Sequence, residues 1–149
     1  MATNSNWVNN ENKYTVSSEG YNKFIAEKEV DFSLYTIAGA TDTIECLKIP
    51  KGAHVTNVGV YVKTVTTSTA DIDSVGDGAA AAAWQTGDIV LDSANSYWMS
   101  VPSDTYPALG GKVYTSADTI DIVLKTAIPT DGVITVWAEY SIISAVANA

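Results

Sequence analysis

The side chains best suited to chemistry are few in this sequence. His54 and Cys46 are the only histidine and cysteine, so imidazole and thiolate ligands are too few for a zinc site. His54 begins a predicted strand, and no Gly-x-Ser-x-Gly turn supplies a serine nucleophile beside it. Cys46 stands in an apolar run and is predicted to be a small buried residue. These residues predict neither a catalytic triad nor an intrachain disulfide.

One stretch has the spacing of metal ligands. Asp71, Asp73 and Asp77 stand in the run Asp-Ile-Asp-Ser-Val-Gly-Asp-Gly. Oxygen ligands at alternate positions converge on calcium once a glycine turns the chain. However, Val75 occupies the third ligand position, and no glutamate stands at the twelfth. Asp71 and Asp73 are equally explained as outward residues of a strand, so we expect no metal and keep the three aspartates as weak calcium candidates.

No other arrangement predicts catalysis. The 17 acidic residues offer many carboxylate pairs for glycoside hydrolysis, but nothing in the sequence singles one pair out. The run Gly110-Gly111-Lys112 lacks the rest of a phosphate-binding loop and is followed by valine. We therefore expect a protein that is not an enzyme and needs no cofactor.

Four tryptophans are the remaining candidates for function. Trp7, Trp84, Trp98 and Trp137 are predicted partner contacts, because tryptophan on a polar strand face or in a loop is typical of subunit interfaces and sugar platforms. Burial in the core is the competing interpretation. It is favoured for Trp84, which would pack under its own loop, and is as good as an interface for Trp137.

Charge argues against nucleic acid and membranes as partners. The chain has a net charge of −9, and all eight of its basic residues are lysines. Arginine is the residue that binds phosphates and guanine edges through two hydrogen bonds, and an acidic chain is repelled by DNA and by anionic lipid. No apolar run approaches the ~20 residues of a membrane span, and the first residues predict no secretory signal. We expect a soluble protein made in a cytoplasm.

From Val30 onward, apolar residues recur at every second position, which is typical of strands with one buried face. Turn residues at 39–42, 50–52, 76–78 and 129–132 separate these runs. The predicted strands are 30–35, 43–49, 54–65, 69–75, 97–101, 112–114, 119–124 and 134–142. Residues 77–96 are predicted as a long excursion with a brief helix or a short strand at 89–91. Because no long helix intervenes, the sequence predicts an all-β antiparallel sandwich of jelly-roll type.

The first 29 residues differ from the rest. Residues 1–29 are polar and rich in asparagine, and they predict an N-terminal arm, whereas residues 30–149 predict the sandwich domain. The arm is expected to be extended or partly helical, since Tyr21, Phe24 and Ile25 lie on one face of a helix drawn over 19–29. We expect it to become ordered against a partner subunit, with the 30–142 domain folding without it.

Several stretches resemble virion structural proteins of tailed phages. They are EVDFS (29–33), LKIPKGAHV (47–55), TADID (69–73), VGDG (75–78), YTSADTID (114–121) and GVITVWAEY (132–140). The similarity spans about residues 29–141, and it lies in the order of these motifs. The asparagine-rich start departs from the pattern, so the resemblance says nothing of residues 1–28.

The resemblance implies a β-sandwich subunit carried on a phage head, as a decoration (cement) protein, a head accessory protein or the base of a head fibre. The expected partners are the major capsid protein and copies of the chain itself, first of all as a trimer, at threefold sites of the shell. The expected location is the outer capsid surface, with synthesis in the host cytoplasm. The alternative is a tail or fibre module that binds host glycans, for which Trp84 and Trp98 would be the stacking platforms.

Overall fold

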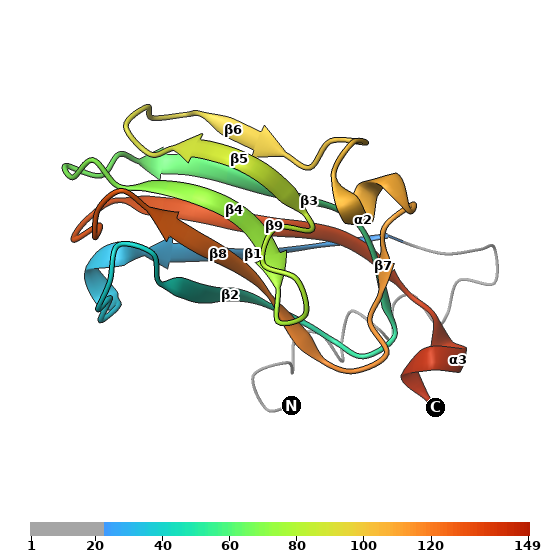
Figure 1. Ribbon diagram of the computed structural model, residues 1–149. Coiled ribbons are helices and arrows are strands. Elements are labelled where there is room, and N and C mark those ends of the chain that lie inside the picture. Colours follow the sequence, from blue (N-terminus) through green and yellow to red (C-terminus); the bar gives the residue numbers. More distant parts are fainter. Residues whose placement is uncertain (1–22) are drawn as a thin grey trace.

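The computed structural model describes residues 23–149, which form two β-sheets packed face to face (Figure 1). Its elements in chain order are β1 (Phe24–Asp31), the 3₁₀ turn η2 (Phe32–Leu34), β2 (Thr43–Ile49), β3 (Ala53–Thr64), β4 (Asp71–Asp77), β5 (Gln85–Val90), β6 (Tyr97–Met99), α2 (Thr105–Ala108), β7 (Lys112–Val113), β8 (Asp118–Lys125), β9 (Val133–Ile142) and α3 (Ser144–Ala147). No helix in this part of the chain is long and apolar enough to cross a membrane.

The strand order identifies the fold as a jelly roll. One sheet runs β1-β9-β3-β6, with β7 also paired to β3, and the other runs β2-β8-β4-β5. Every pairing is antiparallel. The pairs β1–β9, β2–β8, β3–β6 and β4–β5 are nested within one another, as when one long hairpin is wound into two sheets. The predicted all-β sandwich is confirmed.

Alternation along the strands builds the core. One continuous cluster of buried apolar side chains fills the space between the sheets. Two rows predicted to face inward are buried: Val58, Val60 and Val62 in β3, and Ile120, Ile122 and Leu124 in β8. Strand β2 has the predicted bounds, and β3 differs from its predicted bounds by one residue at each end. The period-two pattern therefore located the central strands well.

The first strand corrects two predictions. The helix expected over 19–29 is wrong from Phe24 onward, because Phe24–Asp31 is a strand paired along its whole length with β9. Phe24, Ala26 and Val30 point into the core, so this part of the expected arm belongs to the sandwich. The strand predicted over 30–35 instead ends at Asp31, and Leu34 is exposed rather than inward. The remaining arm residues lie outside the described part of the chain.

Strand β4 contains an irregularity that positions the site described below. Its pairing shifts by one residue between Ile72 and Ser74, which is a β-bulge. The tight turn predicted at 76–78 is also misplaced, because β4 continues to Asp77 and the chain turns over 78–84. The shift reverses which side chains face inward for the rest of the strand, so Asp77 faces the interior.

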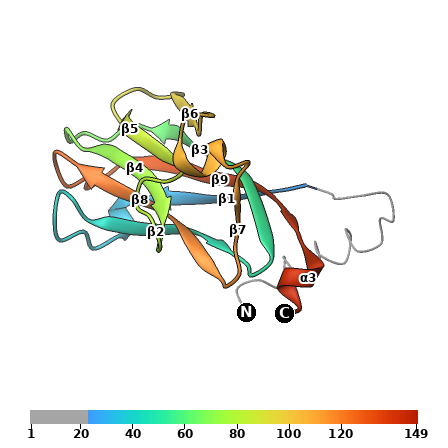
Figure 2. The same cartoon turned by 45° about the vertical axis from the view of Figure 1, so that its right-hand side comes forward.

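The two ends of the sandwich differ. Figures 1 and 2 show the strand-connecting loops at one end and α3 beyond the other. At the loop end, the Asp131 carboxylate accepts hydrogen bonds from the amide and hydroxyl of Thr67, both at 2.8 Å, which ties the β8–β9 turn to the β3–β4 loop. At the other end, the 78–84 turn, the α2 loop and β7 meet around Asp77.

Candidate functional site

Cys46 and His54, the only thiol and the only imidazole of the chain, both make local contacts. Cys46 is buried, and burial raises the pKa of its thiol to about 12, so it stays protonated at neutral pH. Its Sγ lies 3.3 Å from the carbonyl oxygen of Ile44. His54 lies in β3, and its Nε2 is 2.9 Å from the carbonyl oxygen of Gly110. Both residues therefore serve local structure.

The three candidate calcium ligands do not converge. Asp71 accepts a hydrogen bond from the amide of Leu91 at 3.3 Å, and the Asp73 carboxylate is 3.7 Å from Lys125 Nζ. Asp77 faces the interior beyond the bulge. Over residues 23–149, no group of three or more histidine, cysteine or acidic side chains is placed to hold a metal ion. The spacing in the sequence is thus not reproduced in space.

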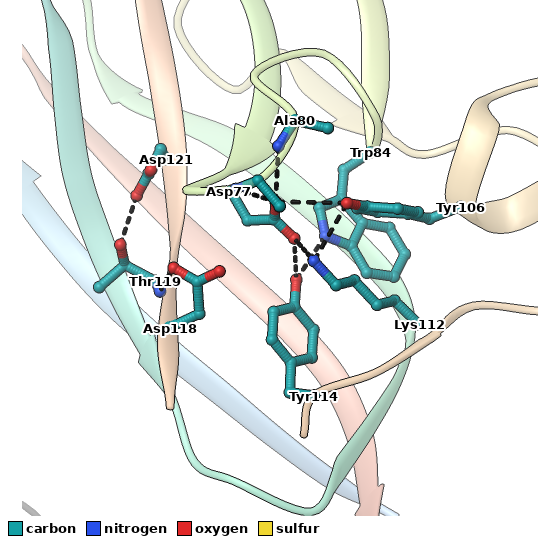
Figure 3. A network of polar contacts seen from close by, with 10 residues as sticks. Asp77, Ala80, Trp84, Tyr106, Lys112, Tyr114, Asp118, Thr119 and Asp121 are labelled. Carbon is teal, nitrogen blue, oxygen red and sulfur yellow. Dashed lines mark hydrogen bonds and ion pairs between the residues drawn. The ribbon is translucent and has the colours of Figure 1, made fainter. Parts of the chain in front are cut away.

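Asp77 is instead the centre of a buried polar network (Figure 3). Its Oδ2 accepts hydrogen bonds from Lys112 Nζ at 2.6 Å and from the Tyr114 hydroxyl at 2.8 Å. Its Oδ1 accepts from the amides of Ala79 and Ala80, both at 3.0 Å. The carboxylate therefore has a donor for each oxygen from the protein itself.

Aromatic side chains enclose this ion pair. The indole Nε1 of Trp84 donates to the Tyr114 hydroxyl at 3.0 Å. Lys112 Nζ lies 4.7 Å from the ring centre of Tyr106 and 4.6 Å from that of Tyr114, which is cation–π geometry. Figure 3 shows the lysine reaching Asp77 between these two tyrosines. The network joins the 78–84 turn, the α2 loop and β7.

Electrostatics hold the pair in its charged form. Burial alone would raise the pKa of Asp77, but the hydrogen bonds from Lys112, Tyr114 and the two amides bring it below its usual value. Burial would lower the pKa of Lys112, but the bonds to Asp77 and Tyr106 raise it. Burial also raises the pKa of Tyr114, so its hydroxyl remains a donor. The ion-paired amine and carboxylate, each hydrogen-bonded on several sides, form a structural clamp between β4 and β7.

A second buried carboxylate behaves in the opposite way. Asp121 of β8 is 5% exposed and accepts a hydrogen bond from the Thr119 hydroxyl at 2.6 Å. Burial raises its pKa to about 6, against the lowering effect of Thr119, and Glu45 and Asp118 raise it further. Glu45 is its direct partner across β2 and β8. Because Asp121 alternates with Ile120 and Ile122, the period-two pattern predicts that it faces outward into solvent, and its burial corrects that expectation.

The tryptophans are placed in three different environments. Trp84 is completely buried, so it is not available to a partner. Trp98 of β6 is partly buried against the core, opposite Val60. Trp137 lies on the outer face of the β1-β9-β3-β6 sheet and is partly exposed. Trp7 lies outside the described residues.

The indole of Trp137 packs directly over Gly59 of the neighbouring strand β3. A Cβ atom on Gly59, its direct neighbour in β3, would lie only 2.3 Å from the indole Nε1. The indole also lies parallel to the ring of Tyr97 in β6, with an interplanar angle of 6° and ring centres 6.2 Å apart. Only glycine admits the indole at this position, so the sheet is shaped to carry an aromatic pair on its outer face.

The outer faces of the two sheets differ in chemistry. The β1-β9-β3-β6 face carries exposed large apolar side chains on its outer strands, namely Ile25, Tyr97 and Met99, with Val101 just after β6. The opposite sheet presents Glu45, Asp73, Asp88 and Lys125. Its only exposed large apolar residue is Val90 of β5, within the part of the chain that the structure describes. We call the first surface the aromatic face.

Comparison with known proteins bears on the fold. No protein-family model and no curated protein matches the chain. A chain from the capsid asymmetric unit of cyanophage Pam1 matches the structure with a TM-score of 0.61 and 19% identity, over 85% of this chain and 89% of that one. A chain from the acid-stable capsid of the Helicobacter pylori bacteriophage KHP30 matches with a TM-score of 0.55 and 18% identity, over 80% and 87%.

The fold is shared with chains of phage capsids. Because each match covers most of both chains, the two matched chains are of nearly the same length as this one. The resemblance read from the sequence motifs is thus matched by an independent likeness in three dimensions.

The sequence did not predict the Asp77–Lys112 network, and it predicted only part of the aromatic face. Asp77 was predicted to lie in a tight turn as a weak calcium candidate, and its pairing with Lys112 joins residues far apart in the chain. Tyr97 and Met99 were treated only as members of a strand. A usable signal was Gly59, because a glycine inside an otherwise β-branched strand indicates close approach by another group.

Proposed function

We propose that this chain is a non-enzymatic virion subunit that decorates the head of a tailed phage, binding the assembled shell and stabilising it. The observation that carries this proposal is the match to two capsid chains of similar length and the same jelly-roll fold. A single small domain is suited to an accessory role on a surface. Its partners would be the major capsid protein and further copies of the chain, arranged as trimers at threefold positions.

Charge supports a place on the outside of the shell. A subunit lining the interior would face packaged DNA, and a chain with a net charge of −9 and no arginine is repelled by phosphate. On the outside, the same charge keeps the particle surface soluble. The polar outer face of the β2-β8-β4-β5 sheet suits solvent, whereas the aromatic face suits contact with protein.

The glycan-binding alternative loses its expected platform. Trp84 is fully buried, and Trp98 packs against the core opposite Val60. The proposed stacking surface is therefore not formed by these two residues.

Purified particles provide the test. Quantitative mass spectrometry is expected to find the chain in many copies per particle, in simple proportion to the major shell protein. Its lysines are expected to react with an amine reagent that cannot enter the particle. Particles lacking the chain are expected to release DNA at a lower temperature than complete ones. Absence from the particle, or a few copies confined to the tail, would overturn the proposal.

A further inference from the structure

One glutamate on the aromatic face has no counter-charge. Glu27 of β1 is exposed and stands directly opposite Trp137 of β9. Side chains paired in this way lie about 4.5–5.5 Å apart at Cβ. Within residues 23–149, the Glu27 carboxylate makes no ion pair and no side-chain hydrogen bond.

Its acidic neighbours on the same face are compensated. Glu29 pairs with Lys63 at 2.7 Å, and Glu139 pairs with Lys23 at 2.9 Å. The face therefore balances the charges on either side of Glu27 and leaves this one carboxylate beside the indole.

An aromatic pair next to a carboxylate is the chemistry that binds a guanidinium group. The planar cation of arginine stacks on indole and phenol rings while its N–H groups donate to a carboxylate. The Trp137–Tyr97 pair supplies the rings, and Gly59 fixes the indole in place. Met99, which stands directly opposite Gly59 in β6, adds an exposed apolar side chain beside the pair.

A second copy of the chain has few cationic side chains that could bind beside Glu27 and the aromatic pair. The chain contains no arginine, and Lys23, Lys63, Lys112 and Lys125 already pair with acidic side chains of their own subunit.

From this we infer that the aromatic face is the docking surface for a different protein, which inserts an arginine from an apolar segment between Glu27 and the Trp137–Tyr97 pair. The identity of that protein as the shell protein rests on the proposed function. The recognition chemistry does not, and it is testable on the isolated chain.

The test is a titration of the full-length ¹⁵N-labelled chain with the peptide acetyl-Leu-Arg-Leu-amide, followed by NMR. At concentrations of about 1–10 mM, we expect the peptide to shift the Trp137 indole N–H and the amides of Glu27, Tyr97 and Met99. The lysine analogue is expected to bind more weakly, and the glutamate analogue is expected not to bind.

Variants separate the two parts of the site. Glu27→Gln should weaken peptide binding about two- to fivefold and Trp137→Ala about tenfold. Glu45→Gln, an exposed glutamate on the other sheet, is the matched control and should change nothing. Because Glu27→Gln leaves the indole and the fold intact, loss of binding in that variant reports recognition rather than unfolding.

Other occupants give distinct results. Equal shifts by all three peptides, or no shift, would overturn the inference. So would an oligosaccharide that perturbs the same resonances in place of the arginine peptide, or a dimer in sedimentation that Trp137→Ala dissociates. If the peptide binds as expected but the chain is absent from particles, the docking chemistry stands and the proposed function fails.

Discussion

At the scale of single residues, two buried aspartates on neighbouring strands respond to their surroundings in opposite ways. Asp77 is surrounded by donors, including a lysine, and its pKa falls below its usual value. Asp121 has one hydroxyl donor and acidic neighbours, and its pKa rises to about 6. Burial acts on both in the same direction, so the difference comes from hydrogen bonds and nearby charges.

The first prediction concerns the ion pair of Asp77. Asp77→Asn is expected to lower the free energy of unfolding by about 2–4 kcal/mol, because Lys112 then remains among aromatic rings without its counter-ion. Asp73→Asn is the control, since its side chain is 52% exposed, and it should cost less than about 0.5 kcal/mol. Urea unfolding at pH 7 measures both, and similar losses would show that the network does not stabilise the fold.

The second prediction concerns acidification. The folded domain holds a proton on Asp121 at a higher pH than the unfolded chain does, where the pKa is about 3.8. Stability from this group therefore rises as pH falls from 7 through about 6, and the gain is complete below about 4. The depressed pKa of Asp77 acts the other way, but only below its ordinary value of 3.8.

Urea unfolding at pH 7.5 and pH 5 tests this sign. The native chain is expected to gain about 1–2 kcal/mol at the lower pH, and Asp121→Asn is expected to remove most of that gain. A native chain that loses stability between these two pH values, or a variant with the same pH dependence, would contradict the assignment of the raised pKa.

At the scale of elements, sequence pattern located the strands but not their irregularities. The alternation in β4 continues correctly from Asp71 to Asp73, and then the bulge before Ser74 reverses the inward face. Nothing local distinguishes this bulge from a regular strand, because it depends on pairing with β8 and β5. That is why Asp77 was placed in a turn at 76–78 and the clamp with Lys112 was missed.

Strand β1 was also mispredicted because its structure depends on pairing with a distant strand. Phe24, Ile25 and Lys28 fit one face of a helix, but Phe24, Ala26 and Val30 also fit alternate positions of a strand. Over so short a segment, the apolar residues fit both the helical period and the strand period of two. Pairing of Phe24–Asp31 with β9 decides between them, and that pairing joins residues more than 100 positions apart.

The third prediction tests the close packing at the turn after β4. A Cβ atom on Gly76 would lie 2.1 Å from the carbonyl oxygen of Ala80, which is fixed backbone. Gly76→Ala is therefore expected to cost about 2 kcal/mol or more. The matched control is Gly78→Ala, where the nearest atom is Asp118 Oδ1 at 2.9 Å, the end of a side chain. It should cost less than about 1 kcal/mol, and equal melting temperatures for the two variants would contradict this packing.

The fourth prediction concerns the residue at which the folded domain begins. Deleting residues 1–22 is expected to leave the melting temperature nearly unchanged, because every strand that the structure describes lies between Phe24 and Ile142. Deleting residues 1–28 should unfold the domain, since it removes Phe24 and Ala26 from the core and most of the β1–β9 pairing. Loss of a phenylalanine side chain alone costs about 3–5 kcal/mol. A stable 29–149 fragment, measured by circular dichroism, would show that β1 is dispensable.

At the scale of the whole molecule, composition and architecture point the same way. With a net charge of −9 and no arginine, the chain is expected not to bind DNA, and the exposed apolar residues of the aromatic face suit that surface to protein contact. The absence of arginine was visible in the sequence. The gathering of Ile25, Tyr97, Met99 and Trp137 on one sheet was not, because three separate strands contribute them.

An electron-microscopy map of the intact particle tests most directly whether this chain decorates the outside of the phage head. We expect jelly-roll density on the outer surface of the shell at its threefold positions. The aromatic face should be turned toward a neighbouring protein, with an arginine of that protein at Glu27 and Trp137. A sandwich on the inner surface, one found only in the tail, or one whose aromatic face is open to solvent would contradict it.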